Sequence, residues 1–379
     1  MELVTYSHEQ THGWKQRLRA DLDSPSTLVI AFGATELVDR PTALSELRAA
    51  YPHSIIVGCS TAGEIHGAQV CDGSLSVAVA RFERTELMYA QARVDTAAES
   101  RAAGEAIARA LLRPGLRAVL VLSDGLHVNG TTLVEGLNGV LPEGVVVTGG
   151  LAGDGDRFKR TWALSEGAAQ ANLVTAVGFY GEHVRVGHGS KGGWDIFGPE
   201  RLVTRAEGNL LYELDGRPAL ELYKSYLGDR AAGLPATGLL FPLSLRSDDA
   251  GDEKRLVRTI LAIDESTQSL TFAGDIPTGS RVQLMRANFD RLVEGAATAA
   301  TAALRDAPDG PVLSVAISCV GRRLVLGERT EEETEATLEV LPPGAQQVGF
   351  YSYGELSPFA AGRCDLHNQT MTLTTLWES

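Results

Sequence analysis

The sequence predicts a mixed α/β fold of α+β character. Repeated α-β-α-β-β units are expected to form mixed sheets, with an antiparallel-rich insertion in the C-terminal half. Three observations predict it. The chain has 379 residues, which exceeds one ordinary hydrophobic core and favours two domains. Runs rich in Val and Ile alternate with segments of helical periodicity, as in layered α/β sheets. The same order of elements then occurs three times.

The first unit begins with the apolar run "TLVIAFG" (27–33), which we expect to be a buried strand. The next segment places Leu44, Leu47 and Ala50 on one face of a helix. A second strand, "SIIVG", then leads into the turn "STAGEI". The segment "EQTHGWKQRLRADL" (9–22), which precedes this unit, has a helical pattern. A helix that also includes His8 places His8 and His12 one turn apart, where they can form an incidental metal site.

The unit recurs from "AVLVLSDG" to "LAGDG" (118–155) and from "VLSVAISCVG" to "YSYGEL" (312–356). The glycines that end the first strand and mark the turn are 30, 28 and 33 residues apart in the three units: Gly33 and Gly63, Gly125 and Gly153, Gly321 and Gly354. An acid follows each second glycine, namely Glu64, Asp154 and Glu355. The alternative is chance similarity among generic βαβ segments; the recurring glycine–acid turn favours a true repeat.

Residues 184–286 interrupt the pattern with short β-type runs separated by Asp-Gly and Pro-Thr-Gly turns, which predicts an antiparallel region. We therefore expect a domain boundary near residues 181–190, with an N-terminal domain at 1–183 and a C-terminal domain at 184–379. The third α/β unit then belongs to the C-terminal domain.

Composition narrows the class of partner and the compartment. The net charge is −14, and no run of Lys and Arg interleaves with aromatic residues, which argues against nucleic acid or an anionic membrane as the main partner. The N-terminus has no signal-peptide core, and no stretch approaches 18 apolar residues. The four scattered cysteines suit a reducing compartment. These features predict a cytoplasmic protein.

The turn "GCSTAGEI" (58–65) is the first candidate site. Backbone amides and the hydroxyl of Ser60 or Thr61, held open by Gly63, can bind a carboxylate, and Glu64 can pair with an ammonium group. That combination suits an amino acid, and strand ends are where ligands bind in open α/β sheets. The alternative interpretation is a tight turn with no ligand.

Other chemistry is less well supported at this turn. Phosphate binding lacks the GxxxxGK[ST] pattern, and neither GxSxG nor HExxH occurs in the chain. A nucleophilic Cys59 needs a base, and spacing places neither His53 nor His66 on its thiol. An enzyme such as a hydrolase or transferase, using Cys59 with Glu64 or a histidine, remains the alternative to a binding protein.

The third unit offers a second set of polar residues. Tyr353, Glu355 and Asn368 complete a polar site if this unit faces the same cavity as the first; the alternative is a β-turn stabilised by Asn368. A protein-interaction scaffold without a ligand is a third interpretation of the whole chain.

Three separated motifs resemble the FIST domain: "VGCSTAGEI", "VTRAEGNLLYELDGRPALELY" and "GFYSYGEL...LHNQTMTLTTL". The resemblance spans nearly the whole chain and assigns 1–183 to the FIST N-terminal region and 184–379 to the FIST C-terminal region. It implies an intracellular sensor without enzymatic activity that binds a small ligand, such as an amino acid, and signals to a separate protein. Similar stand-alone proteins of the NosP type bind haem, sense nitric oxide and act on a histidine kinase or a cyclic-diguanylate enzyme. A homodimer is compatible with this arrangement.

For haem, the sequence offers two candidate axial ligands. His188 lies in the glycine-rich "VGHGSKGGW", near Trp194 and Phe197, and His367 lies in "LHNQT" before the last predicted strand. Either histidine can instead be an ordinary hydrogen-bonding residue.

Overall fold

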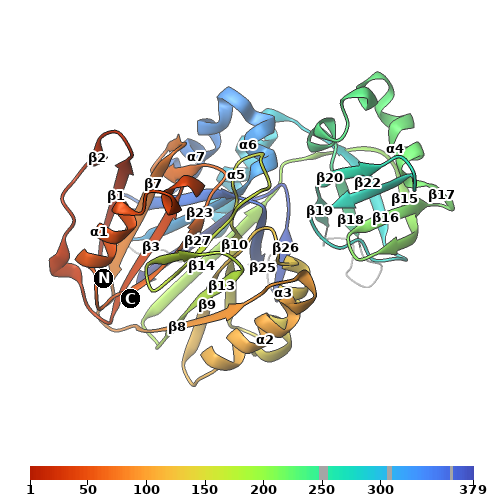
Figure 1. Ribbon diagram of the computed structural model, residues 1–379. Helices are drawn as coiled ribbons and strands as arrows, with labels where there is room; N and C mark the ends of the chain where they lie inside the picture. Colours follow the sequence, from red (N-terminus) through yellow and green to blue (C-terminus); the bar gives the residue numbers. More distant parts are fainter. Residues whose placement is uncertain (247–254, 305–309, 359–361) are drawn as a thin grey trace.

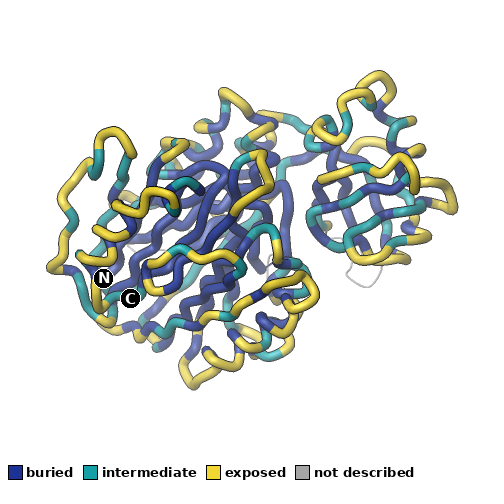
Figure 2. The backbone as a smooth tube through the Cα atoms, viewed as in Figure 1, coloured by how far each residue is buried: buried dark blue, intermediate teal, exposed yellow. Residues whose placement is uncertain are grey.

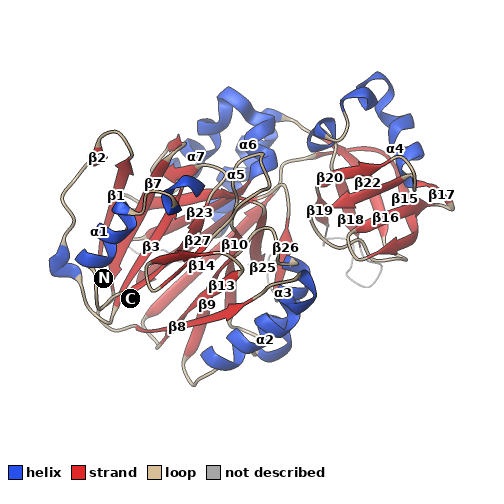
Figure 3. Ribbon diagram, in the orientation of Figure 1, coloured by secondary structure: helices blue, strands red, loops and turns tan. Residues whose placement is uncertain are grey.

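The computed structural model describes residues 1–246, 255–304, 310–358 and 362–379, and it confirms the mixed α/β class. Three mixed sheets form one body, and an antiparallel sheet forms a smaller inserted domain beside it (Figure 1). Figure 3 shows that helices cover the outside of the body while strands fill its centre. None of the helices in the described ranges is long and apolar enough to cross a membrane.

The first unit is built on two parallel strands, β3 (Thr27–Gly33) and β4 (Ile55–Ser60), joined through α1 (Thr42–Ala50). The last strand of the unit, β7 (Ser74–Arg81), runs antiparallel to β3. β1 (Glu2–Glu9) pairs with the other side of β7. The result is a mixed sheet, as the alternating final strand of each repeat predicts.

The second and third units repeat this strand order. The second contains β8 (Glu86–Arg93), α2 (Ser100–Leu111), β9 (Leu116–Ser123), α3 (Gly130–Val140), β10 (Val146–Leu151) and β13 (Leu173–Tyr180). The third contains β14 (Val184–Lys191), α5 (Phe289–Ala302), β23 (Leu313–Cys319), α6 (Val320–Leu326), α7 (Thr330–Glu339), β24 (Gln346–Ser352) and β27 (Met371–Glu378). In both, the two middle strands are parallel and the last strand is antiparallel to them.

Each unit also sends a hairpin into the sheet of another unit. These hairpins are β5 (Glu64–His66) with β6 (Gln69–Cys71), β11 (Ala163–Ser165) with β12 (Ala168–Gln170), and β25 (Gly354–Pro358) with β26 (Cys364–His367). β5 pairs with β24 of the third unit, β25 with β10 of the second, and β11 with β4 of the first. The exchange is cyclic, so each unit completes the sheet of the next and the three form one closed body.

The inner faces of the three sheets pack on one another and form a shared core. Phe32 of the first unit and Phe350 of the third lie with ring centroids 4.6 Å apart, and Phe82 meets Phe179 of the second at 6.0 Å. Helices cover the outer faces; on α2, Ala103, Ile107 and Leu111 are buried at helical spacing. Figure 2 shows the central strands buried along most of their length.

The helix expected before the first unit is not formed. The segment instead contains β2 (Gly13–Trp14) and one short 3-10 helix, η1 (Ala20–Leu22). Pairing of β1 with β7 and the edge-on contact of Trp14 with Tyr6 hold it extended, so tertiary contacts override the helical pattern. His8 lies in β1, and the two histidines do not share a helix face.

The inserted domain confirms the antiparallel-rich insertion. It contains β15 (Asp195–Glu207), β16 (Leu210–Leu214), β17 (Arg217–Pro218), α4 (Ala219–Leu227), β18 (Leu243–Arg246), β19 (Leu256–Arg258), β20 (Ile260–Asp264), β21 (Ser269–Phe272) and β22 (Arg281–Arg286). These strands curl around their own apolar core, and the domain is inserted between β14 and α5. The sequence-based division at 183/184 falls between β13 and β14.

Candidate functional site

The glycine–acid turns lie where each chain segment leaves its own sheet for the sheet of another unit. In the first unit, β4 ends at Ser60 and β5 begins at Glu64 in the sheet of the third unit. Residues 61–63 therefore bridge two sheets at the carboxyl ends of β3 and β4. This is the edge at which α/β sheets place ligands.

Glu64 is buried and anchors this turn to the last strand of its unit. Its carboxyl group accepts hydrogen bonds from the Thr61 hydroxyl and from the backbone N–H (2.9 Å) and hydroxyl (2.7 Å) of Ser74. Burial raises the pKa of Glu64 to about 7 despite these three donors. The side chain is only 1% exposed, although it contributes to a cavity wall.

Glu355 makes the equivalent contacts in the third unit. It accepts from the Ser352 hydroxyl (2.7 Å) and from the hydroxyl (2.9 Å) and backbone N–H (3.2 Å) of Thr370. Burial raises the pKa of Glu355 to about 8. The shared pattern shows that the acid of the turn first serves the fold, by tying the hairpin to the strand that follows it.

Asp154, the acid of the second turn, has a different task. It accepts hydrogen bonds from the backbone N–H groups of Phe158, Lys159 and Arg160 and from the Tyr353 hydroxyl. Burial opposes ionisation, but these four donors together hold the pKa of Asp154 below its usual value. The carboxylate thereby folds the loop that follows it, and Tyr353 stacks on Phe158 at 4.4 Å.

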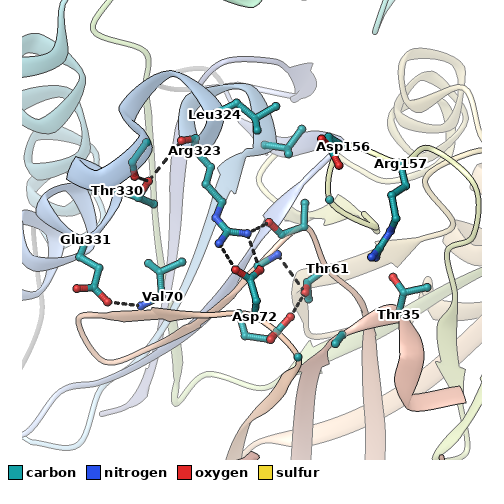
Figure 4. Close-up of a pocket in the computed structure, with 18 of the residues that line it drawn as sticks. Thr35, Thr61, Val70, Asp72, Asp156, Arg157, Arg323, Leu324, Thr330 and Glu331 are labelled. Atoms are coloured by element: carbon teal, nitrogen blue, oxygen red, sulfur yellow. Dashed lines mark hydrogen bonds and ion pairs between the residues drawn. The ribbon is translucent and has the colours of Figure 1, made fainter. Parts of the chain in front are cut away.

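A cavity of about 650 Å³ opens at the turn of the first unit, and all three units line it (Figure 4). The first unit contributes Thr35, Thr61, Gly63, Glu64 and Asp72; the second contributes the loop 155–157; and the third contributes α6 and the residues that follow it. The cyclic exchange of hairpins brings these segments together, because β5 and β6 lie against the third unit.

Arg323 of α6 forms one wall of this cavity. Its guanidinium donates to both carboxylate oxygens of Asp72 (2.8 and 2.6 Å) and to the carbonyl oxygen of Ala62 (2.6 Å). The contact with Asp72 raises the pKa of Arg323. Gly63 has φ +131°, and a Cβ atom there would lie 2.5 Å from Arg323 Nη1. The positive φ favours glycine at this position, and a Cβ atom would also displace the guanidinium.

Thr35 and Arg157 lie across the cavity from Arg323 (Figure 4). Arg157 pairs with Glu36 at 2.9 Å. The Thr35 hydroxyl is buried, the residue being 3% exposed, and it makes no hydrogen bond within the described part of the chain. A buried hydroxyl without a partner is costly, so this oxygen is the strongest indication that a polar ligand group belongs here.

The cavity wall carries more acidic than basic side chains. Its acids besides Glu64 are Glu36, Asp72, Asp156, Glu328 and Glu331, and its bases are Arg157 and Arg323. Both arginines already have carboxylate partners. The excess negative charge favours a ligand that carries an ammonium group.

Comparison with known proteins agrees with the sequence motifs. The FIST N domain model matches residues 27–217, and the FIST C domain model matches residues 219–358. The chain belongs to the FIST family. FIST domains are signalling sensor domains, so the cavity described above lies in a protein of a sensor family.

Similar proteins occur in mycobacteria. An uncharacterized protein of Mycobacterium tuberculosis is 27% identical over 259 residues, and an uncharacterized protein of Mycobacterium bovis is 29% identical over 272 residues. Each match covers 67% of this FIST chain and 66% of the relative, so the chain spans about two thirds of the length of these relatives.

The FIST cavity brings together three of the residues that the sequence singled out, Thr61, Gly63 and Glu64. Ser60 points into the protein, where its hydroxyl accepts from the Trp162 N–H at 3.1 Å. Tyr353 and Glu355 serve the contacts described above and do not line this cavity.

Asn368 is also away from the cavity. It is fully buried and donates to the carbonyl oxygen of His367 at 3.0 Å. Cys59, the nucleophile of the enzyme alternative, is fully buried within β4, and burial raises the pKa of its thiol. Neither Cys59 nor any histidine lines the cavity in the described part of the chain.

The two haem candidates lie in different surroundings. His367 is 2% exposed, and its Nε2 lies 2.9 Å from the carbonyl oxygen of Ser357. His188 lies in β14 and lines a separate cavity of about 380 Å³ whose wall includes Leu141, Pro142 and Val147. His367 does not line that cavity. Over the described ranges, no group of three or more His, Cys, Asp or Glu side chains is arranged to hold a metal ion.

Sequence reasoning missed Thr35, Asp72, Arg157 and Arg323. Thr35 follows the first strand by two residues, so the strand-end argument that selected Thr61 applies to it equally. Arg157 and Arg323 come from other units and reach the cavity only through tertiary structure.

Proposed function

We propose that this FIST protein is a sensor whose ligand is a small molecule of amino-acid type, bound in the cavity of the first unit. The observation that carries the proposal is the buried, unpartnered hydroxyl of Thr35, a residue that lines the same cavity as Arg157 and Arg323. In this proposal the ligand carboxylate accepts from Thr35 and an arginine, and the ligand ammonium group lies toward acids of the cavity wall.

The size of the cavity supports the proposal. A volume of about 650 Å³ lies within the usual range of small-molecule sites. Occupancy is proposed to shift a two-state equilibrium, which requires that the ligand bind the two states with unequal affinity. A separate signalling protein, such as a histidine kinase or a cyclic-diguanylate enzyme, is the proposed reader of that shift.

Thermal unfolding in the presence of each of the common L-amino acids tests the site. A ligand at about 100 times its Kd stabilises the folded state by about 2.7 kcal/mol, which raises Tm by about 3 °C for a chain of this size. We expect Thr35→Ser to retain the rise and Thr35→Val to lose most of it. A rise of equal size in the Thr35→Val protein would place the ligand elsewhere.

A haem beside His188 is a second candidate, favoured by the composition of that cavity. An imidazole next to a mainly apolar wall is what haem binding requires, and Arg363 on the same wall can pair with a propionate. The haem iron would supply the nitric oxide site. We expect a Soret band after haem is added, and its loss in His188→Ala but not in His12→Ala, an exposed histidine control. No band in the wild-type protein would exclude haem.

A further inference from the structure

The helix α6 contacts both the ligand cavity and the inserted domain. Val320, Arg323 and Leu324 line the cavity. Val325 and Leu326 pack in a small apolar cluster with Val257 and Met285 of the inserted domain, with Trp194 of the segment that enters it, and with Leu292 of α5. Figure 1 shows α6 on the side of the body that faces the inserted domain. A displacement of α6 would therefore change the contacts of this helix with both the cavity and the inserted domain.

Arg322, the neighbour of Arg323, makes hydrogen bonds beside both connections between the body and the inserted domain. Its guanidinium donates to the carbonyl oxygen of Gly192, before β15, and to that of Leu292 in the first turn of α5 (2.8 Å). Residues 192–194 and 287–288 are the only segments that join the inserted domain to the body along the chain. One side chain thus contacts the entry segment and the helix turn that directly follows the exit segment.

This arginine is itself held by a buried carboxylate. Arg322 and Glu333 are both fully buried and are joined through Nε (3.0 Å) and Nη2 (2.7 Å). Glu333 also accepts from the hydroxyls of Ser318 (2.9 Å) and Tyr351 (2.7 Å), at the ends of β23 and β24. A buried, fully hydrogen-bonded pair has few alternative arrangements, so α6 is positioned rigidly relative to the sheet and to both connections.

The two connections are also fastened to each other. Asn288, the N-cap of α5, donates to Asp195 at 3.2 Å, and Arg291 pairs with the same carboxylate. Gly193 has φ +90°, and a side chain there would overlap the carbonyl oxygen of Arg291. The entry and the exit therefore move as one hinge.

We infer that α6 transmits ligand occupancy from the cavity to the inserted domain, with Arg323 as the contact on the cavity side and Arg322 as the clamp on the hinge. The inference rests on the proposed function for the input, because a ligand that competes with Asp72 or Ala62 for Arg323 changes the hold on α6. In this scheme the inserted domain changes its position with ligand occupancy, and a signalling partner recognises that change.

Amide hydrogen exchange at the hinge tests this relay without a ligand. Arg323→Ala and Arg157→Ala each remove one paired arginine from the same cavity, but only Arg323 lies on α6. We expect the amides of Ala287 and Leu292 to exchange about fivefold faster in Arg323→Ala, the size expected from a partly exposed ion pair, and to be unchanged in Arg157→Ala. Asp72→Asn breaks the same pair without altering α6 and is expected to act in the same direction.

The outcomes separate the relay from the proposed function. Unchanged hinge exchange in both Arg323→Ala and Asp72→Asn, or an equal increase in Arg157→Ala, overturns the relay, even if these variants bind L-amino acids more weakly. A faster hinge in Arg323→Ala and Asp72→Asn, with no amino acid binding to the wild-type protein, supports the relay and counts against the proposed ligand. If amide exchange is faster throughout the Arg323→Ala protein, that variant is globally destabilised. The hinge exchange of Asp72→Asn then decides whether the relay holds.

Discussion

The first and third units carry the same turn at the same point of the fold, yet their surroundings differ. Glu64 and Glu355 make matching hydrogen bonds to the strand that follows them. Beside Glu64 the chain leaves a cavity. Near Glu355 the segment that leads into the inserted domain packs on the chain: the Trp194 indole donates to the carbonyl oxygen of Gln369 at 2.8 Å, and Gln369 and Asn368 are fully buried.

The comparison shows that the repeated turn stabilises the fold in both units. We infer that its availability to a ligand depends on which segments cover it. The recurring acid indicates where hairpins cross between units. The turn of the first unit stays uncovered, and the neighbouring units supply Arg157 and Arg323 to the cavity beside it.

The largest expected effect concerns the sealed third unit. Glu333→Ala leaves Arg322 buried without its carboxylate, which costs about 3–5 kcal/mol of unfolding free energy. Urea denaturation measures it, with Glu36→Ala as the control, because its partly exposed pair with Arg157 contributes at most about 1 kcal/mol. An equal loss of unfolding free energy in Glu333→Ala and Glu36→Ala would contradict the prediction that the buried pair of the third unit contributes more stability than the exposed pair at the cavity.

The next effect is a pH dependence that differs between the two acids. Both carboxyls bind a proton more tightly in the folded protein than at the ordinary pKa of 4.5, so their contribution to stability is full below that pH and is lost as pH rises to about 7 for Glu64 and about 8 for Glu355. Each contributes a loss of at most about 1.4 kcal/mol per pH unit in that window.

Urea denaturation of Glu64→Gln and Glu355→Gln between pH 4 and 9, roughly, checks this prediction. We expect both variants to lose less stability than the wild type as pH rises, with the difference for Glu355→Gln extending to higher pH. Asp154→Asn is the opposite control: the pKa of Asp154 is lowered, so its contribution is lost as pH falls. If the unfolding free energy of both Gln variants changes with pH as steeply as that of the wild type, the raised pKa values of Glu64 and Glu355 are contradicted.

A smaller effect separates the glycines of the two turns. Gly63→Ala forces a positive φ on alanine and crowds Arg323, which is expected to cost about 2 kcal/mol. Gly354 has no positive φ, and a Cβ there meets only the end of the Leu366 side chain at 2.8 Å. Gly354→Ala should therefore cost less in the same denaturation experiment; the reverse order would mean that the first turn is not the more constrained one.

The smallest effect is a stabilisation. Thr35→Val removes a buried hydroxyl that has no partner within the described ranges and is expected to raise the unfolding free energy by about 1 kcal/mol without ligand. Thr35→Ser keeps the hydroxyl and serves as the control. A clear loss of stability in Thr35→Val would show that the hydroxyl already has a partner and is not kept for a ligand.

Much of the fold follows from local sequence patterns. Strand-like runs and helical spacing predict the repeat, its parallel strand pairs and the antiparallel insertion. The outer strands β1 and β8 were not predicted, because a strand near a sheet edge is specified by its pairing partner more than by its own periodicity. The prediction of a helix before the first unit was wrong because strand pairing and tertiary contacts, not the local helical pattern, determine the structure there.

The site was predictable only in part. Thr61, Gly63 and Glu64 were found because they follow a strand end in sequence. Asp72 reaches them through a hairpin, and Arg323 through a hairpin that joins another sheet, which no local pattern specifies. Tyr353, Glu355 and Asn368 were grouped with them on the condition that the third unit faces the same cavity. They do not line it: Tyr353 bonds to Asp154, and Asn368 bonds to the carbonyl oxygen of His367.

Titration calorimetry of the wild-type and Thr35→Val proteins with the common L-amino acids tests the central claim, that the uncovered strand end of the first unit is the sensor site. The account predicts that at least one amino acid binds the wild type and that Thr35→Val weakens this binding about tenfold, the size of one lost hydrogen bond. Binding of equal strength to both proteins, or to neither, would contradict it.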